Sequence, residues 1–248
     1  MRLHHALFGP LDDAGNRREA VTRRLGGAIA LGLLGDGEQL PPEQELATSL
    51  NVSTVTLRDA LAELREKGLV ETRRGRGGGS FVRVSGAGLS ALSRDRLTEM
   101  GVSDLREIGD LHVAVAGTAA RLAAERASEA EIERLRELVD RLREARDDAD
   151  VRRIDGRLHI EMAAAAQSAR LTMMEIELQG ELAQLTWRAA AGRSGNELAD
   201  ARLLVVDAIA GRRADHARTL VEQQLDEETL RLIDDHIRLM RDRAGEEG

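Results

Sequence analysis

The side chains with the clearest chemical potential lie in residues 53–58, at the start of a predicted helix. Ser53 is a favoured N-cap residue, and the first turn after it would expose Thr54, Val55, Thr56 and Arg58. Arginine can pair with guanine or a phosphate, threonine can donate to phosphates, and a valine or threonine methyl can contact thymine. When a protein helix reads DNA, its N-terminal residues often enter the major groove. The pattern therefore predicts recognition of double-stranded DNA.

A segment rich in arginine and glycine follows this helix. Residues 69–71 and 81–83 have the pattern of two strands, and the tip between them includes Arg74, Gly75, Arg76 and Gly77. Glycine lets the backbone approach a ligand closely, and arginine suits a narrow minor groove or a row of phosphates. A dinucleotide-binding glycine motif is the alternative, but that motif must open a helix, whereas this one links two strands.

The surrounding residues predict a winged helix-turn-helix that would position these groups. Pro41 and Pro42 stop any earlier helix, and Asn51 tolerates the left-handed conformation that ends a short one. A preceding helix over residues 16–34 should pack on the pair. The apolar residues of the two short helices recur at helical spacing: Leu46, Leu50, Leu57, Leu61 and Leu64.

Asp155 and His159 form a second group with possible chemistry. They stand four residues apart on a predicted helix, so both can face one point. An aspartate and a histidine suit zinc, nickel or manganese, although two ligands are an incomplete set and such pairs also occur on solvated faces. A metal-dependent enzyme is therefore a distant alternative, since no nucleophile or complete ligand set accompanies the pair.

Charge is distributed unevenly along the 248 residues, whose net charge is −8. Residues 53–83 hold 7 Lys and Arg against 4 Asp and Glu, whereas residues 84–248 hold 24 against 33. The basic side chains thus gather where DNA contact is predicted. The chain has no Cys, and its aromatic residues are Phe8, Phe81 and Trp187, which argues against disulfides and against base stacking.

The predicted organisation is mostly α-helical. We expect a flexible arm over residues 1–15, the winged helix-turn-helix with its small β-hairpin over 16–84, and a linker over 85–102. Residues 103–248 should form an all-α antiparallel bundle, with helices near 104–126, 129–148, 151–168, 171–191, 196–210 and 213–243. No apolar run approaches the roughly 20 residues of a membrane span, so we expect a cytoplasmic protein.

Residues 40–82 resemble the DNA-binding domain of the GntR family of bacterial transcription regulators. The matching motifs are LPPEQELA, VSTVTLRDAL, GLV and GRGGGSFV. The resemblance implies that Ser53, Thr56 and Arg58 contact DNA, with Gly75 in the wing. Family members usually carry operator-contacting arginines where this chain has Gln44 and Thr54, which changes the expected operator.

The helical half resembles the FCD effector-binding domain through DLHVAVAGTAARLAAERAS, DGRLHIEMAAAAQSARL and DAIAGRRADHARTLVEQQL. Many FCD domains hold a metal with an Asp-x3-His pair and two later histidines, whose positions fall here on Arg202 and Gln224. Because a guanidinium does not ligate metals, we expect Arg202 to pair with a carboxylate effector instead. His159 and Gln224 would be further donors. His112 would join them or be an ordinary core histidine.

Together these features predict a ligand-responsive transcription regulator rather than an enzyme. The expected form is a homodimer that binds an inverted-repeat operator and acts as a repressor, with a small carboxylate as effector. An acyl-CoA-sensing regulator is the alternative.

Overall fold

The computed structural model describes residues 8–11, 16–185 and 195–246. Most of the predicted arm therefore lies outside the described residues, as does Trp187. Within the described part of the arm, Phe8 and Leu11 are buried, and the Leu11 N–H donates to the Leu50 carbonyl at 3.2 Å.

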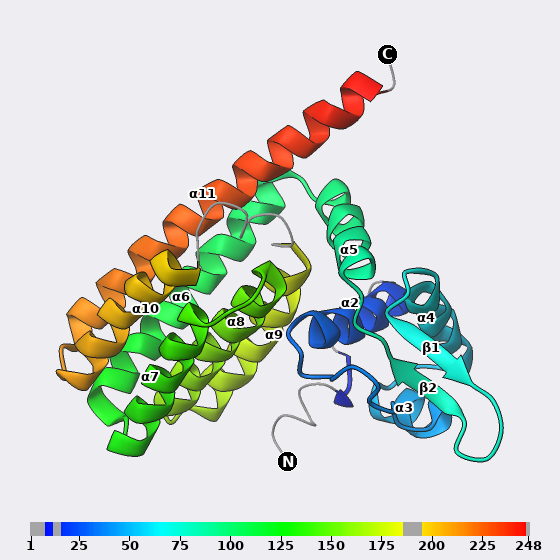
Figure 1. Cartoon of the computed structure of the whole chain (residues 1–248), viewed down its shortest axis with the longest axis horizontal. Helices are drawn as coiled ribbons and strands as arrows, with labels where there is room; N and C mark the ends of the chain where they lie inside the picture. Colours follow the sequence, from blue (N-terminus) through cyan, green and yellow to red (C-terminus); the bar gives the residue numbers. More distant parts are fainter. Residues whose placement is uncertain (1–7, 12–15, 186–194, 247–248) are drawn as a thin grey trace. The chain divides into compact units, whose positions relative to one another are not determined.

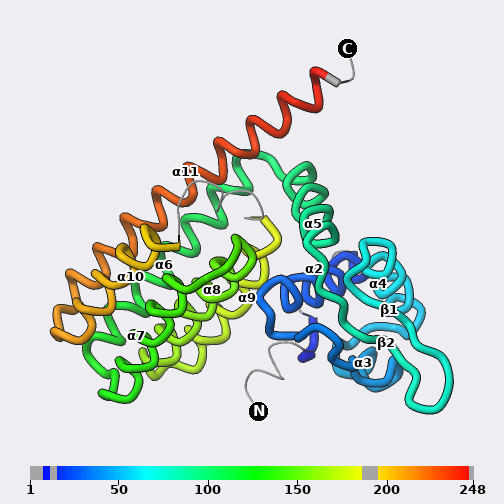
Figure 2. The backbone as a smooth tube through the Cα atoms, viewed as in Figure 1, coloured from blue at the N-terminus to red at the C-terminus, as the bar shows by residue number. Residues whose placement is uncertain are grey.

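The chain divides into two compact units, each with its own core (Figures 1 and 2). The first comprises Met1–Arg94 and Gly180–Gln184, and the second comprises Asp95–Gln179 and Leu185–Gly248. The helix α5 (Gly86–Glu99) occupies most of the predicted linker. No helix in the described ranges is long and apolar enough to cross a membrane.

The first unit is a three-helix domain with an antiparallel hairpin. Its helices α2 and α3 pack against α4, and β1 pairs with β2 so that Val70 lies opposite Val82 and Arg73 opposite Gly79. We refer to β1, β2 and the turn between them as the wing. The bounds are α2 (Arg17–Ala30), α3 (Glu43–Ser49), α4 (Thr54–Glu66), β1 (Val70–Arg73) and β2 (Gly79–Val82).

Local signals in the sequence set the ends of these helices. The side chain of Asn16 accepts from the first backbone N–H groups of α2, and Ser53 accepts from the Thr56 N–H at 3.0 Å. Asn51, after α3, has φ of 56°, which confirms its predicted left-handed conformation. The apolar stripes meet in a core that includes Val21, Leu25, Ile29, Leu46, Leu50, Leu57, Leu61 and Leu64.

The second unit is an antiparallel bundle of six helices in the described residues, which confirms the predicted fold class. Helix α6 packs along α11 and also contacts α8 and α10, while α7 packs against α8 and α10. Figure 2 shows α6 and α11 side by side. The bounds are α6 (Val102–Arg126), α7 (Glu129–Arg143), α8 (Asp148–Ala165), α9 (Ala169–Leu185), α10 (Gly195–Ala210) and α11 (Ala214–Glu246).

Caps explain where these helices follow the sequence prediction and where they depart from it. Ser128 and Glu131 form the predicted capping box at the start of α7. The predicted boundary between α7 and α8 was wrong, because Asp147 accepts from the Asp150 N–H at 2.8 Å and starts α8 at Asp148. Helix α7 accordingly ends at Arg143.

Glycines on α6 allow α11 to approach closely, and they do so in two different ways. A methyl group added at Gly109 would lie 2.4 Å from Cγ2 and 2.5 Å from Oγ1 of Thr229. The Thr229 side chain is branched at Cβ and donates to the Leu225 carbonyl at 2.9 Å, so it has little freedom to move. At Gly117 the added methyl would instead meet Cγ of Glu222 at 2.9 Å, and that longer side chain can rotate away.

We therefore predict opposite outcomes for two glycine substitutions on one helix. Gly109→Ala should lower the free energy of unfolding of the second unit by about 1–3 kcal/mol through overpacking. Gly117→Ala should be neutral or stabilising by up to about 1 kcal/mol, because alanine favours helix more than glycine does. Urea unfolding followed by circular dichroism measures both, and equal effects would show that α6 and α11 are not held this closely.

Candidate functional site

The N-terminal end of α4 presents the side chains predicted to read DNA. Thr54 and Arg58 are exposed, and Val55 is 64% exposed. Thr56 is half-buried, and its Oγ1 lies 2.8 Å from Oγ of Ser53. The cap thus orders both hydroxyl groups at the start of the helix before any ligand arrives.

Arg58 is paired on the protein surface. Its Nε donates to Oε2 of Glu43 on α3 at 2.7 Å, and the arginine side chain is 66% exposed. Exposed ion pairs of this kind contribute about 0–1 kcal/mol, so DNA can compete for the guanidinium. Gln44, beside Glu43, is also exposed.

The tip of the wing combines positive-φ glycines with exposed arginines. Gly75 has φ of 98° and Gly77 has φ of 84°, conformations that residues with a Cβ rarely adopt. Arg73 is held on the strands, since its guanidinium carbon lies 4.2 Å from the centre of the Phe81 ring. Arg74 and Arg76 project from the turn and are exposed. The DNA-contact residues predicted from the sequence therefore lie at α3, the start of α4 and the wing tip.

The second unit contains a buried ionic network centred on Arg202 of α10, whose side chain is 2% exposed. Its Nε and Nη2 donate to the two carboxylate oxygens of Asp155 on α8, at 2.7 and 2.9 Å. Nη1 donates to Oε1 of Gln224 at 2.7 Å, and Nη2 also donates to Glu228 at 2.8 Å. Gln224 and Glu228 are both on α11, so the network joins three helices.

The charges in this network stabilise each other. Burial acts to raise the pKa of the Asp155 carboxyl, but the charge and hydrogen bonds of Arg202 outweigh burial and lower that pKa below its ordinary value. Burial also acts to lower the pKa of Arg202, and the two carboxylates more than reverse this effect and raise it. The guanidinium and the Asp155 carboxylate are therefore both ionised at neutral pH.

This network bears on two predictions from the sequence. Both oxygens of Asp155 accept hydrogen bonds from Arg202, whereas the metal prediction had Asp155 and His159 bind one ion. Arg202 has two carboxylate partners already, so it does not present an unpaired cation to an effector carboxylate. Glu228 was missed, although it lies four residues after Gln224 and therefore on the same helix face.

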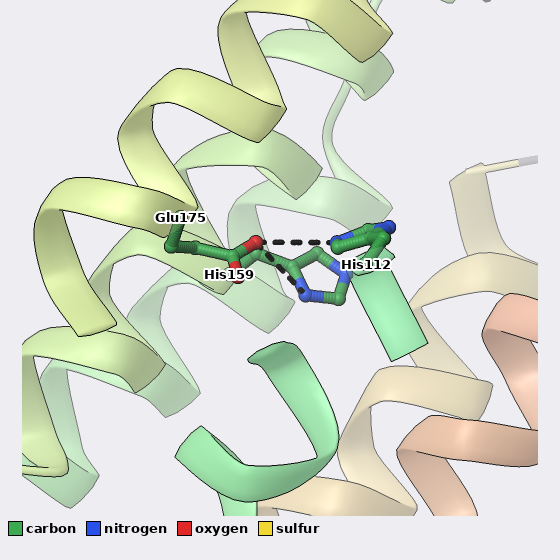
Figure 3. A group of neighbouring side chains, drawn as sticks. All are labelled: His112, His159 and Glu175. Atoms are coloured by element: carbon green, nitrogen blue, oxygen red, sulfur yellow. Dashed lines mark hydrogen bonds and ion pairs between the residues drawn. The ribbon is translucent and has the colours of Figure 1, made fainter. Parts of the chain in front are cut away.

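A second buried cluster contains His112, His159 and Glu175, whose side chains point toward one another in Figure 3. Helix α8 links it to the first, because it carries both Asp155 and His159. Nε2 of His112 on α6 lies 3.2 Å from Oε1 of Glu175 on α9, and Nδ1 of His159 lies 4.0 Å from the same oxygen. The two imidazole rings have their centres 5.2 Å apart. Gln179, one turn after Glu175, donates to that oxygen at 2.8 Å and lies 3.0 Å from Nε2 of His112.

Several polar atoms in this cluster lack partners among the described residues. Neither ring nitrogen of His159 has a hydrogen-bond partner, and neither does Oε2 of Glu175. Burial, together with the charge of Arg202, lowers the pKa of His159 to about 4, so its imidazole is neutral at pH 7. Burial acts to raise the pKa of Glu175, but the hydrogen bond and charge of His112 lower it overall.

Sequence reasoning identified two of the four members of this cluster. It placed His112 either in the effector site or in the core, and the structure buries it against Glu175 and Gln179. Glu175 and Gln179 were missed. Their spacing of four residues was visible, but spacing alone did not show that this face of α9 is buried.

Comparison with known proteins gives family matches in both units. Residues 17–79 match the model "Bacterial regulatory proteins, gntR family", and residues 107–227 match the FCD domain. The HTH-type transcriptional regulator RmpR of Mycobacterium gastri is 41% identical over 221 residues, covering 88% of this chain and 81% of that protein. The HTH-type transcriptional repressor NanR of Cronobacter sakazakii is 28% identical over 227 residues, covering 84% and 82%.

Solved structures share the fold. E. coli McbR/YncC superimposes with a TM-score of 0.55 at 16% identity, covering 89% of this chain and 98% of that one. A GntR family regulator from Pseudomonas syringae pv. tomato gives 0.50 at 18% identity, covering 95% and 94%. At these identities the likeness shows the fold alone.

Removing the guanidinium of Arg202 should strongly destabilise the second unit. Arg202→Met keeps a similar volume but leaves the Asp155 carboxylate unpaired, and we expect the free energy of unfolding at pH 7 to fall by about 3–5 kcal/mol. Because Arg202 lowers the pKa of Asp155 in the folded state, the contribution of the pair is complete above about pH 4 and is lost as the pH falls through the lowered value. Urea unfolding of the second unit at pH 7 measures the change.

The control is the double variant Asp155→Asn with Arg202→Met, which removes both charges. It should recover a large part of the stability lost in the single variant. If the double variant is no more stable than Arg202→Met alone, an unpaired Asp155 carboxylate is not the cause of the loss.

Proposed function

Because this chain belongs to the GntR family of bacterial regulatory proteins and carries an FCD domain, we propose that it represses transcription as a homodimer. The chain is a DNA-binding transcription regulator and not an enzyme. The proposal adds its operator, its direction of control and its effector: an inverted repeat, repression, and a small carboxylate.

The start of α4 carries this proposal. Three features occur together there: a helix start ordered by Ser53, an exposed Val55, and Arg58 in a weak surface pair. In a helix-turn-helix protein these side chains would meet base edges, while the arginines of the wing would meet phosphates or the minor groove. The NanR relatives are named repressors, which supports the proposed direction of control.

A homodimer follows from the size of one recognition helix. One such helix reads only one half-site, and a twofold dimer presents two copies to an inverted repeat about one helical turn apart. Effector binding in the second unit would then change operator affinity through a coupling of typically about 1–3 kcal/mol.

The proposed effector must fit the buried polar groups of the second unit. An acyl chain needs an apolar lining, whereas the two clusters at α8 hold charged and polar side chains. A small polar acid suits them better than acyl-CoA does. Since Arg202 is paired with Asp155 and Glu228, the carboxylate must find its positive charge elsewhere in this unit.

The first experiment is a selection of DNA from a random library with the full chain, followed by affinity measurements on the enriched sequence. We expect an inverted repeat and binding by two copies of the chain. Arg58→Ala should lower specific affinity by about 1–3 kcal/mol, or roughly 5- to 150-fold, because a base or phosphate contact is lost.

Arg136→Ala is the matched control, since it removes an equal charge from α7, where the Arg136 side chain is 43% exposed. It should leave operator affinity unchanged. An Arg58→Ala variant that binds the operator as tightly as the parent would remove Arg58 from the contact surface. An enriched site without twofold symmetry would overturn the proposed dimeric mode.

A further inference from the structure

We propose that His112, His159 and Glu175 bind one divalent transition-metal ion, of the class of Zn²⁺ or Ni²⁺. The inference goes beyond the proposed function, because it concerns the interior of the second unit and can be tested without DNA. The ligand atoms come from three helices, α6, α8 and α9, and all lie within 4.8 Å of one another. Figure 3 shows the three side chains converging.

The set of metal-ligand positions that the FCD resemblance implies does not fit a metal in this chain. Of those four positions, Asp155 and Gln224 are hydrogen-bonded to Arg202, which occupies a third and already supplies a positive charge. His159 is the remaining position, and its two ring nitrogens make no hydrogen bond within the described part of the chain. The His159 ring lies beside His112 and Glu175, so an ion bound by His159 would lie between it and these two residues.

One of the unpartnered ring nitrogens of His159 is an atom that a metal would bind, together with Nε2 of His112 and a carboxylate oxygen of Glu175. A buried polar atom without a partner costs about 1–3 kcal/mol, and His159 and Glu175 hold three such atoms. Neutral imidazole nitrogens and a carboxylate oxygen are good ligands for zinc and nickel. Zinc ligand atoms at bond lengths of about 2.0–2.2 Å are about 3.4 Å apart in a tetrahedron, so small side-chain rotations would close the site.

The hydrogen bonds around His112 conflict in the absence of a cation. If Nε2 carries a proton, it can donate to the ionised carboxylate of Glu175, but the proton then repels the amide N–H of Gln179. If Nε2 carries no proton, its lone pair can accept from Gln179, but it then repels the carboxylate oxygen of Glu175. Exchanging the nitrogen and oxygen of the Gln179 amide does not resolve the conflict, because the amide oxygen would then repel the carboxylate oxygen of Glu175. A cation between Nε2 and Oε1 removes the repulsion and leaves the Gln179–Glu175 hydrogen bond in place.

The charge balance of the interior points the same way. Apart from the imidazoles, the two adjoining clusters hold the carboxylates of Asp155, Glu175 and Glu228 against the single guanidinium of Arg202. A divalent ion would neutralise this excess of two negative charges. The same ion would supply the positive charge that a carboxylate effector needs, a consequence that rests on the proposed function.

The test is metal binding by the full chain after dialysis against a chelator. Titration calorimetry with Zn²⁺ and Ni²⁺ should give about one ion per subunit, and Co²⁺ should give the visible absorption of a nitrogen- and oxygen-ligated site. The melting temperature of the second unit should rise with metal concentration. His112→Gln and Glu175→Gln should each weaken binding at least about 100-fold, since each removes a direct ligand.

His216→Gln is the control for adventitious binding, because His216 is an exposed histidine on α11. It should leave affinity unchanged. Circular dichroism without metal checks that each variant is folded. Folded wild-type protein that binds no ion, or ion affinity that survives in folded His112→Gln and Glu175→Gln, would overturn the proposal. Neither result would affect the proposed reading of DNA by α4.

Discussion

The second unit depends most on the pairing of a buried guanidinium with carboxylates. A charge in the interior is tolerated only when it is paired and hydrogen-bonded, and Arg202 meets this condition through α8 and α11. All of its contacts persist only while three helices keep their relative positions. The network also fixes α8, and therefore fixes His159, one turn from Asp155, against His112 and Glu175. The ionic network thus determines the geometry of the neighbouring cluster.

The two units use charged side chains in contrasting ways. In the first unit the key arginine is exposed and its pair is weak, so its contact can be exchanged for another. In the second unit the key arginine is sealed among its partners, and its role is to hold helices in place. A regulator needs both kinds of group, because recognition requires side chains that can change partners and signal transmission requires a rigid framework.

Much of the fold was predictable because its signals are local. Ser53 and Ser128 are caps that act on backbone within one turn, and the leucine stripes show which faces are buried. Partner choice in the interior was not predictable, because it depends on helix packing. The spacing of Asp155 and His159 indicated a shared ligand, yet packing brings Arg202 to one and Glu175 towards the other. Glu175 was missed because nothing near it in the sequence shows that this face of α9 is enclosed.

The surface pair between Arg58 and Glu43 has a consequence for how the protein searches a chromosome. Any phosphate that engages Arg58 must first displace a carboxylate held 2.7 Å away. This cost is about 0–1 kcal/mol and is the same on every sequence, so it lowers the affinity for random DNA and for an operator alike. If Arg58 contacts DNA as proposed, random DNA would be released sooner, and the ratio of the two affinities would be unchanged. An acidic neighbour of this kind would therefore shorten each stop on DNA without changing the preference for one sequence over another.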